Sequence, residues 1–419
     1  MAKPVILSDR FKQCRFAGAK HRSPGPSFLT AGHFIKSGAL MKIADVTVLP
    51  VSYRLPEGSG ATMGVGRMIK RDAVLVKVLT DEGLVGWGEA HHGRSPGAIA
   101  KLIDTTLKPM ILGMDALDTN AVWLRLYKGH FATHGFGAGT AIAMSGIDMA
   151  LWDIRGKAAG WPIYRLLGGG ARSHRAYAGG ITLGFQAPEA LAEEAAGYVE
   201  MGYRALKLRL GDTPERDAAR VRAVRKALGE DVEILTDVNA AYGLDEVRTL
   251  MPALDDCRVG WLEEPFPPHD TYAYRKAAAL GRTPLAAGEN HYTRFEFAEL
   301  LRDDAVSILQ PDLSKTGGIT ETLRIAGMAS ARKQKIYPHT SMTGLNMAAS
   351  LHFLAGIENA GYFEADATRD NPFRAALTGH DFAIDGNGEI RAPEAAGLGV
   401  EVDEDFVRRH PLIEGPCYV

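Results

Sequence analysis

Charged residues recur at nearly constant spacing through the second half of the chain. Each ends, or lies in, a short apolar segment typical of a β-strand, and the series is Lys207, Asp237, Glu263, Glu289, Asp312, His339 and Glu364. Successive members are 30, 26, 26, 23, 27 and 25 residues apart, the length of one parallel strand with its crossover helix. A repeat this regular over seven strands predicts a β/α barrel.

Three consecutive members of the series are carboxylates, Asp237, Glu263 and Glu289. The carboxyl ends of barrel strands meet at one mouth, where three carboxylates would repel one another strongly unless a cation lay between them. Oxygen ligands on three rigid strands favour Mg²⁺ over zinc, so we expect one Mg²⁺ per chain. The alternative is that the three residues are separate helix caps or exposed strand ends, which requires coincidence in three successive units.

Asp312 and His339 end neighbouring strands and form a candidate acid–base pair. A carboxylate that accepts from one ring nitrogen fixes the tautomer and makes the other nitrogen a better base. The alternative is a buried histidine with an unrelated aspartate. Asn239 follows Asp237 by two residues and shares its face, so it either contacts the substrate, which we favour, or fixes the loop.

The chain, at 419 residues, is longer than a plain eightfold barrel and therefore needs further parts. Strand patterns at 42–54, 72–80 and 84–90, followed by a long helical pattern at 138–158, indicate an α+β domain. Seven strand–helix units and an eighth strand indicate an α/β fold of the (β/α)₇β type. We expect a disordered extension at 1–40, an N-terminal α+β capping domain at 41–165, the barrel at 166–380, and a segment at 381–419 that returns to the capping domain.

Composition narrows the classes of partner and compartment. Apolar residues make up 46% and charged residues 23%, with a formal charge of −2, which gives no electrostatic signal for nucleic acid or an anionic membrane. Three scattered cysteines indicate reduced thiols and a cytoplasmic protein, and no apolar run is as long as a membrane-spanning helix. We expect a homo-oligomer, whose size the sequence leaves open.

Two glycine-containing loops, 55–70 and 91–97, lie in the region of the capping domain. Neither has the spacing of a phosphate-binding loop. We interpret them as a lid over the barrel mouth, with flexible connectors as the alternative.

Six short motifs occur together and in order. They are Lys-Leu-Arg at 207–209, Thr-Asp-Val-Asn at 236–239, Leu-Glu-Glu-Pro at 262–265, Gly-Glu-Asn at 288–290, Gln-Pro-Asp at 310–312 and Pro-His-Thr at 338–340. In this combination the chain resembles the mandelate racemase subgroup of the enolase superfamily, and the resemblance covers residues 41–402.

The resemblance implies metal-assisted removal of a proton next to a carboxylate, giving an enediolate stabilised by Mg²⁺. It also implies that Glu364, in its protonated form, is a donor to the developing charge. We expect an acid-sugar dehydratase, acting on an aldonate or aldarate, in which His339 is the base and Lys207 neutralises the substrate carboxylate. A racemase, epimerase or cycloisomerase with the same enediolate is the alternative, followed by a catalytically silent metal-binding relative.

Arg209 departs from the Lys-x-Lys that is usual in this family. In the resembled enzymes the second lysine is a base on the face opposite the histidine, and two opposed bases are what a racemase needs. A guanidinium stays protonated at ordinary pH and is a poor proton acceptor. Arg209 therefore favours dehydration by His339 alone, while a second base at Arg209 or Lys207 is the alternative.

Overall fold

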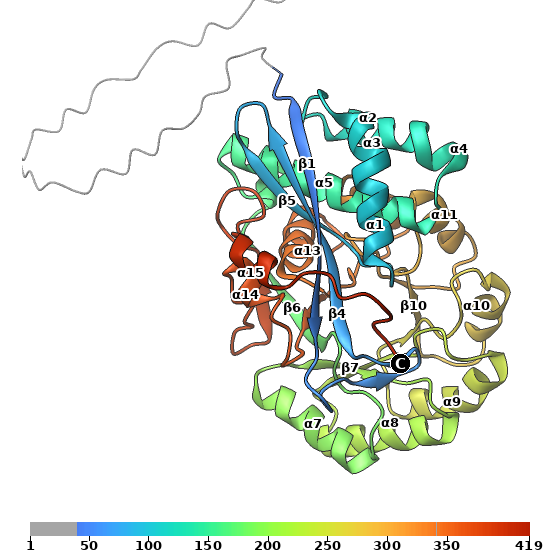
Figure 1. The fold of residues 1–419 in the computed structure, drawn as a ribbon. Helices are drawn as coiled ribbons and strands as arrows, with labels where there is room; N and C mark the ends of the chain where they lie inside the picture. The colour runs from blue at the N-terminus through green and yellow to red at the C-terminus, as the bar shows by residue number, and fades with distance from the viewer. Residues whose placement is uncertain (1–39, 341) are drawn as a thin grey trace, which may run out of the picture. The chain divides into compact units, whose positions relative to one another are not determined.

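The computed structural model describes residues 40–340 and 342–419. The extension expected at 1–40 lies outside these residues, apart from Leu40. The described chain begins with a three-stranded antiparallel sheet of order β1-β4-β5, formed by β1 (Ile43–Arg54), β4 (Lys70–Thr80) and β5 (Val85–Ala90) (Figure 1). Alternating valines pair across it, and a turn at 81–83 joins the last two strands, with Gly83 at φ 83°.

One long helix, α5 (Ala138–Ala159), packs against this sheet. The approach is so close that a Cβ added at Gly86 would lie 2.1 Å from the carbonyl oxygen of Ala150. Only glycine allows this packing. The other helical segments of this region are α1 (Pro96–Leu102), η1 (Ile103–Leu107), α2 (Lys108–Ile111), α3 (Thr119–Leu126), η2 (Tyr127–Phe131) and α4 (Ala132–His134).

A parallel sheet of order β11-β10-β9-β8-β7-β6-β12 follows. Its strands are β6 (Ser173–Gly179), β7 (Ala205–Arg209), β8 (Glu233–Asp237), β9 (Leu262–Glu263), β10 (Leu285–Ala287), β11 (Ile308–Leu309) and β12 (Phe363–Asp366). The strand expected near 336–339 is reduced to parallel bridges from Ile336 to Leu309 and to Ala360. These bridges close the ring between β11 and β12, as the (β/α)₇β prediction requires.

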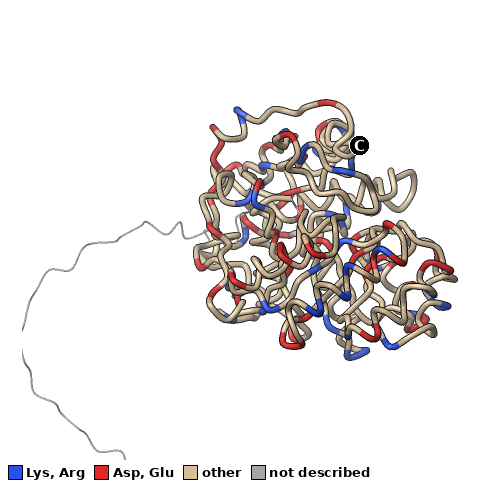
Figure 2. Tube along the Cα trace, turned by 90° about the horizontal axis from the view of Figure 1, so that it is seen from below, with Lys and Arg blue, Asp and Glu red and all other residues tan. Residues whose placement is uncertain are grey.

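A helix follows each strand except the last. The seven are α7 (Pro188–Glu200), α8 (Pro214–Leu228), α9 (Leu244–Asp256), α10 (Thr271–Ala277), α11 (Thr293–Arg302), α12 (Gly318–Ser330) and α13 (Gly344–Gly356). Side chains of Thr213, Asp270 and Thr343 cap the N-termini of three of them. Acidic and basic residues are intermingled along the chain, in keeping with its small formal charge (Figure 2).

The remaining elements are short. They are the two-residue strands β2 (Thr62–Met63) and β3 (Gly66–Arg67), then α6 (Ile163–Leu166), α14 (Ala375–Thr378), β13 (Glu389–Arg391) and α15 (Glu404–Arg409). β13 pairs with β6 of the barrel, so the chain after residue 381 first extends the barrel. Only beyond it does the chain bridge to residues 51, 68 and 162. None of the helices in residues 40–340 and 342–419 has the length and apolar character needed to cross a membrane.

Candidate active site

Strand alternation sets the position of the site. Tyr177, Ala205, Leu235, Trp261 and Ala286 form a buried cluster within the barrel sheet. Side chains two residues further along a strand lie on the same face, so Lys207, Asp237 and Glu263 follow this cluster toward the carboxyl ends. The indole nitrogen of Trp261 donates to Glu263 over 3.0 Å and so links the apolar layer to the polar mouth.

The three carboxylates expected to bind metal come together. Each of Asp237, Glu263 and Glu289 offers an oxygen, and these oxygens lie within 4.8 Å of one another. The residues are 1%, 0% and 8% exposed, so water screens their charges poorly. Burial raises the pKa of Glu263 to about 8, although Lys207 opposes the shift. Buried oxygen donors with this excess of negative charge fit a hard divalent cation.

Lys207 lies at the centre of the carboxylates. Its ammonium is 2.7 Å from Glu263, 2.9 Å from Glu364 and 3.4 Å from Asp237. Burial lowers the pKa of Lys207, but these neighbours outweigh burial and hold it above its usual range. The side chain is therefore a fixed cation.

Arg209 forms an ion pair with Asp237 and donates to the carbonyl of Gly180. Burial disfavours its charge, but Asp237 outweighs burial and raises the pKa of Arg209. Its Nε is buried without a hydrogen-bond partner in the described part of the chain.

Asp312 and His339 meet as a pair. Oδ2 of Asp312 is 2.7 Å from Nδ1 of His339, and Oδ1 of Asp312 accepts from both the amide and the hydroxyl of Ser314 at 2.7 Å. Asp312 is thereby fixed, and it fixes the ring in turn. The other ring nitrogen, Nε2, lies 2.8 Å from Glu289. Burial lowers the pKa of His339, but Glu289 and Glu364, with the hydrogen bond to Asp312, raise it to about 10.

Glu364, on β12, pairs with Lys207. Its carboxylate is 2.9 Å from Lys207 and accepts from the amide of Thr340 at 3.1 Å. Burial favours its neutral form, but Lys207, with His339 and Arg209, outweighs burial and lowers the pKa of Glu364 to about 2. In this arrangement Glu364 is an ionised partner of Lys207, and its role as a protonated donor during the reaction stays a prediction.

Asn239 lies beside Asp237 with a positive φ of 50°, a conformation that asparagine tolerates. Its amide nitrogens are 2.9 and 3.4 Å from Asp237, and its Oδ1 is 3.4 Å from Arg209. These contacts fix the loop, and contact of Asn239 with the substrate stays a prediction.

Two residues of the site, Gln310 and Lys315, lie outside the regular spacing of charged positions. The ammonium of Lys315 is 3.4 Å from Glu289, and the amide of Gln310 donates to Glu263 over 2.6 Å. Gln310 could have been found, because it precedes Asp312 by two residues and shares its face. Lys315 lies in a loop, where no period applies.

A second group of potential ligands lies outside the mouth. Ligand atoms of Asp72, His92 and Cys417 are within 4.8 Å of one another and buried. The ammonium of Lys70, however, is 3.0 Å from Asp72, and Nδ1 of His92 accepts from the amide of Arg94. The charge of Asp72 is already balanced by Lys70, and Nδ1 of His92 already accepts a hydrogen bond. We therefore interpret these three residues as stabilising the fold and not as binding a metal.

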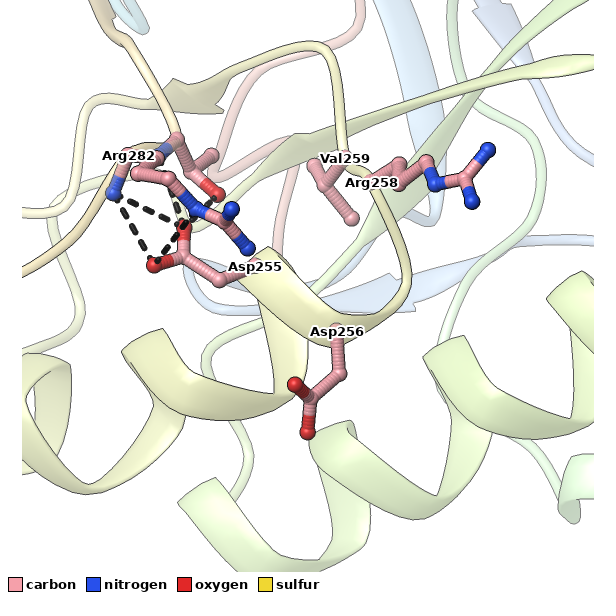
Figure 3. Close-up of a pocket in the computed structure, with 6 residues that line it drawn as sticks. Asp255, Asp256, Arg258, Val259 and Arg282 are labelled. Atoms are coloured by element: carbon pink, nitrogen blue, oxygen red, sulfur yellow. Dashed lines mark hydrogen bonds and ion pairs between the residues drawn. The ribbon is translucent and has the colours of Figure 1, made fainter.

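A surface pocket at the other end of the barrel is also structural (Figure 3). It is lined by residues that precede β9 and β10 or end α9, among them Asp255, Arg282 and Thr283. The carboxylate of Asp255 accepts from the backbone amides of both loop residues and from the hydroxyl of Thr283, at 2.8 to 3.0 Å. These hydrogen bonds join the end of α9 to the loop that precedes β10.

The chain matches two known families of protein domains and is similar in sequence to curated enzymes. The family described as the mandelate racemase / muconate lactonizing enzyme N-terminal domain matches residues 44–168, and the enolase C-terminal domain-like family matches residues 190–406. An arabinonate dehydratase from Saccharolobus solfataricus is 36% identical over 79% of this chain and 88% of its own. A D-galactarolactone cycloisomerase from Agrobacterium fabrum is 34% identical over 87% of this chain and 97% of its own.

Solved structures of enolase superfamily members are similar to this chain in fold. An enolase superfamily member from Polaromonas sp. JS666 is 54% identical, with a TM-score of 0.88 over 90% of this chain and 100% of that one. A racemase from Streptomyces coelicolor A3(2), solved with bound magnesium, is 26% identical, with a TM-score of 0.80 over 88% and 100% of the two chains. With both of its domain types matched and its fold shared, the chain belongs to the mandelate racemase / muconate lactonizing enzyme family of the enolase superfamily.

Proposed function

We propose that this protein is a lyase that dehydrates a polyhydroxy carboxylate, an aldonate or aldarate, to a 2-keto-3-deoxy acid. The observation that carries the proposal is the contact between His339 and Asp312 beside the three buried carboxylates. The arabinonate dehydratase among the relatives supports this choice of chemistry. Within it, His339 is the base and Asp312 is the residue that orients it.

A single base is favoured because the cations on the β7 side cannot accept protons. Arg209 is paired with Asp237, and Lys207 has three carboxylates within 3.4 Å. Both therefore hold their protons more tightly than usual. Racemisation by two opposed bases requires one of these groups to be neutral.

His339 must itself be neutral to act. Glu289 is the strongest of the groups that raise the pKa of His339, through its contact at 2.8 Å. When Glu289 shares its charge with a bound cation, that effect weakens, and Nε2 becomes free to accept a proton. The metal site and the base are in this way coupled through one carboxylate.

Residues Asp237, Glu263 and Glu289 would hold one Mg²⁺ per chain. When bound, the cation would supply Lewis-acid stabilisation of the charge that develops on the substrate carboxylate. Lys207 would neutralise the same carboxylate, and Asn239 and Arg209 would border the substrate. Glu364 would keep Lys207 in position through their contact at 2.9 Å.

The proton then follows a short path. The bond from the α-carbon to its hydrogen breaks, and Nε2 of His339 takes the proton. The bond from the β-carbon to its hydroxyl breaks next, and His339 returns the proton so that water leaves. The enol that remains gains a proton at the β-carbon and loses the proton of its enol hydroxyl to solvent, and so becomes the 2-keto-3-deoxy acid.

A cycloisomerase or racemase is the second candidate, and the cycloisomerase from Agrobacterium fabrum supports it. The two are separated by incubating the protein and Mg²⁺ with a set of aldonates and aldarates and identifying the products. We expect 2-keto-3-deoxy acids, and none from the His339→Asn variant. An isomer of unchanged composition would support the second candidate, and no conversion at all would indicate a catalytically silent relative.

A further inference from the structure

Glu263, the middle member of the carboxylate triad, is held by two buried donors. Its Oε2 accepts from the indole nitrogen of Trp261 over 3.0 Å and from the side-chain amide of Gln310 over 2.6 Å. Trp261 and Gln310 are 2% and 0% exposed, so bulk water does not compete with them. An ionised carboxylate has about two acceptor sites on each oxygen, and both sites of Oε2 are therefore filled.

The other oxygen of Glu263 keeps one open acceptor site. Oε1 accepts from the ammonium of Lys207 over 2.7 Å, which occupies one of its sites. Glu263 can therefore bind a cation through Oε1 alone, and not through both oxygens at once.

The barrel fixes both donors to Oε2. The indole of Trp261 packs edge to face with the rings of Tyr177 and Tyr337, whose centroids are 5.5 and 5.4 Å away. A Cβ added at Gly288 would lie 2.7 Å from the backbone nitrogen of Gln310, so only glycine allows these two strand ends to lie so close. The position of each donor is thus set by the barrel and not by the carboxylate.

Gln310 carries an unpaired acceptor as well. Its Oε1 is buried without a hydrogen-bond partner among the residues that the structure describes. A buried acceptor without a partner costs free energy, so stability alone does not explain a glutamine at this position. Its amide nitrogen, in contrast, is well used on Glu263.

The other two carboxylates of the triad are also held by donors. Oδ1 of Asp237 accepts from the amide of Asn239 over 2.9 Å, and Oδ2 accepts from Arg209. Oε1 of Glu289 accepts from the side chain of Asn290 over 3.0 Å. One oxygen from each member of the triad lies within 4.8 Å of the others. The triad therefore offers a cation one oxygen from each carboxylate.

We propose that Gln310, together with Trp261, is a positioning residue that limits Glu263 to one metal-binding oxygen and so makes the site prefer Mg²⁺ over Ca²⁺. This inference rests on the metal site of the proposed function. Mg²⁺ requires a near-ideal octahedron of oxygens and keeps several waters, so single carboxylate oxygens suit it. Ca²⁺ takes about six to eight oxygens and often binds a carboxylate through both of them, which Glu263 does not allow.

The test is Gln310→Met, which removes the donor to Oε2 of Glu263 and keeps a side chain of similar length. The full chain, freed of metal with a chelator, is titrated by isothermal calorimetry with Mg²⁺ and separately with Ca²⁺. We expect the unmodified protein to bind Mg²⁺ more tightly. In the variant the ratio of the two dissociation constants should shift toward Ca²⁺ by about tenfold or more, because loss of a residue that orients a metal ligand weakens metal binding by about that factor.

Gln334→Met is the matched control. The side-chain amide of Gln334 donates to the carbonyl of Val306 over 3.2 Å, and its Oε1 also lacks a partner in the described part of the chain. Val306 precedes β11, so this bond lies at the amino ends of the barrel strands, away from the triad. The control should keep the metal preference of the unmodified protein. Trp261→Phe, which removes the other donor and keeps a ring, should shift the preference in the same direction as Gln310→Met.

The possible failures are distinct. If the unmodified protein binds no Mg²⁺, the metal site of the proposed function is overturned and this inference with it. If the unmodified protein binds Mg²⁺ no more tightly than Ca²⁺, or if Gln310→Met changes both affinities equally or not at all, the inference alone is overturned. Should Gln310→Met fail to fold or bind neither cation, the same comparison with Trp261→Phe decides on the same terms.

Discussion

Nδ1 of His339 lies 2.7 Å from Oδ2 of Asp312, and both residues are almost completely buried. Substituting His339 with asparagine should remove the base while keeping a polar side chain of similar reach. We expect turnover to fall at least about 100-fold, together with exchange of the α-proton in D₂O. Exchange is followed by NMR of the recovered substrate. If the variant still exchanged the proton, a second base would exist and the single-base mechanism would be wrong.

Glu263→Gln should abolish binding of the cation. The substitution removes one negative charge from the middle of the carboxylate triad and leaves the ammonium of Lys207 2.7 Å from a neutral amide. Isothermal titration should show one Mg²⁺ site per chain in the unmodified protein and none in the variant. Glu230→Gln is the control, because Glu230 is 62% exposed and pairs with Arg258. Equal binding by Glu263→Gln would remove the metal assignment.

Arg209→Lys should not turn the protein into an epimerase. A lysine at this position would still lie beside Asp237, so its charge would be retained. Unreacted substrate recovered after partial conversion should therefore keep its configuration at the α-carbon, as shown by chiral chromatography. Inversion at that carbon would mean that the amine accepts protons here.

Gly64→Ala tests the contact between the hairpin of β2 and β3 and the barrel. The new methyl group would lie 2.5 Å from the carbonyl of Val238, so the hairpin must move away from the mouth. We expect a raised KM and faster proteolysis within residues 55–70, since a displaced lid admits water and protease. Gly197→Ala in α7, where a Cβ meets nothing within 4 Å, is the control. Kinetics like those of the control would show that the hairpin is only a connector.

Glu89 makes stability depend on pH. It lies on β5, bonds to Thr343 and Asn346, and burial, against these bonds, raises its pKa from 4.5 to about 8. The folded state therefore binds more protons than the unfolded state between these values, so stability falls as pH rises through this window. Glu89→Gln removes the dependence, because the amide does not titrate.

The comparison is made by urea unfolding of both proteins at about pH 5 and about pH 8. The stability of the variant relative to the unmodified protein should increase between the two, by an amount on the order of 1 kcal/mol or more. An unchanged difference would show that Glu89 titrates normally in the folded protein.

The sequence predicts that Asp237, Glu263 and Glu289 come together, and that Asp312 meets His339, because each lies at a strand end, where a regular period determines which side chains converge. Ile336 shows the limit of this reasoning, since its strand is present only as bridges to Leu309 and Ala360. The contact between Glu364 and the ammonium of Lys207, at 2.9 Å, could not be predicted either, because the motifs do not specify distances between side chains on different strands.

Contacts between segments far apart in the sequence also cannot be predicted from the local sequence pattern. Nothing in the residues around Tyr418 indicates that they pair with β3, because a strand of this length has no distinguishing period. Asn346 donates from its backbone amide to Glu89 and from its side chain to Asp312, the latter over 3.0 Å. Neither hydrogen bond is indicated by the sequence. Tertiary packing alone places these groups together.

The bond between the ammonium of Lys70 and the carbonyl of Ile413 joins residues 343 positions apart. Neighbouring barrel strands are joined by far shorter loops, and the entropy of closing a loop rises with its length. We therefore expect the rim of the mouth to form late in folding, after the barrel strands have paired. The amides of Arg67 and Val419, which each donate to the other's carbonyl, would then gain protection from hydrogen exchange after those of β7 and β8, and the candidate active site would be the last part of the molecule to exclude water.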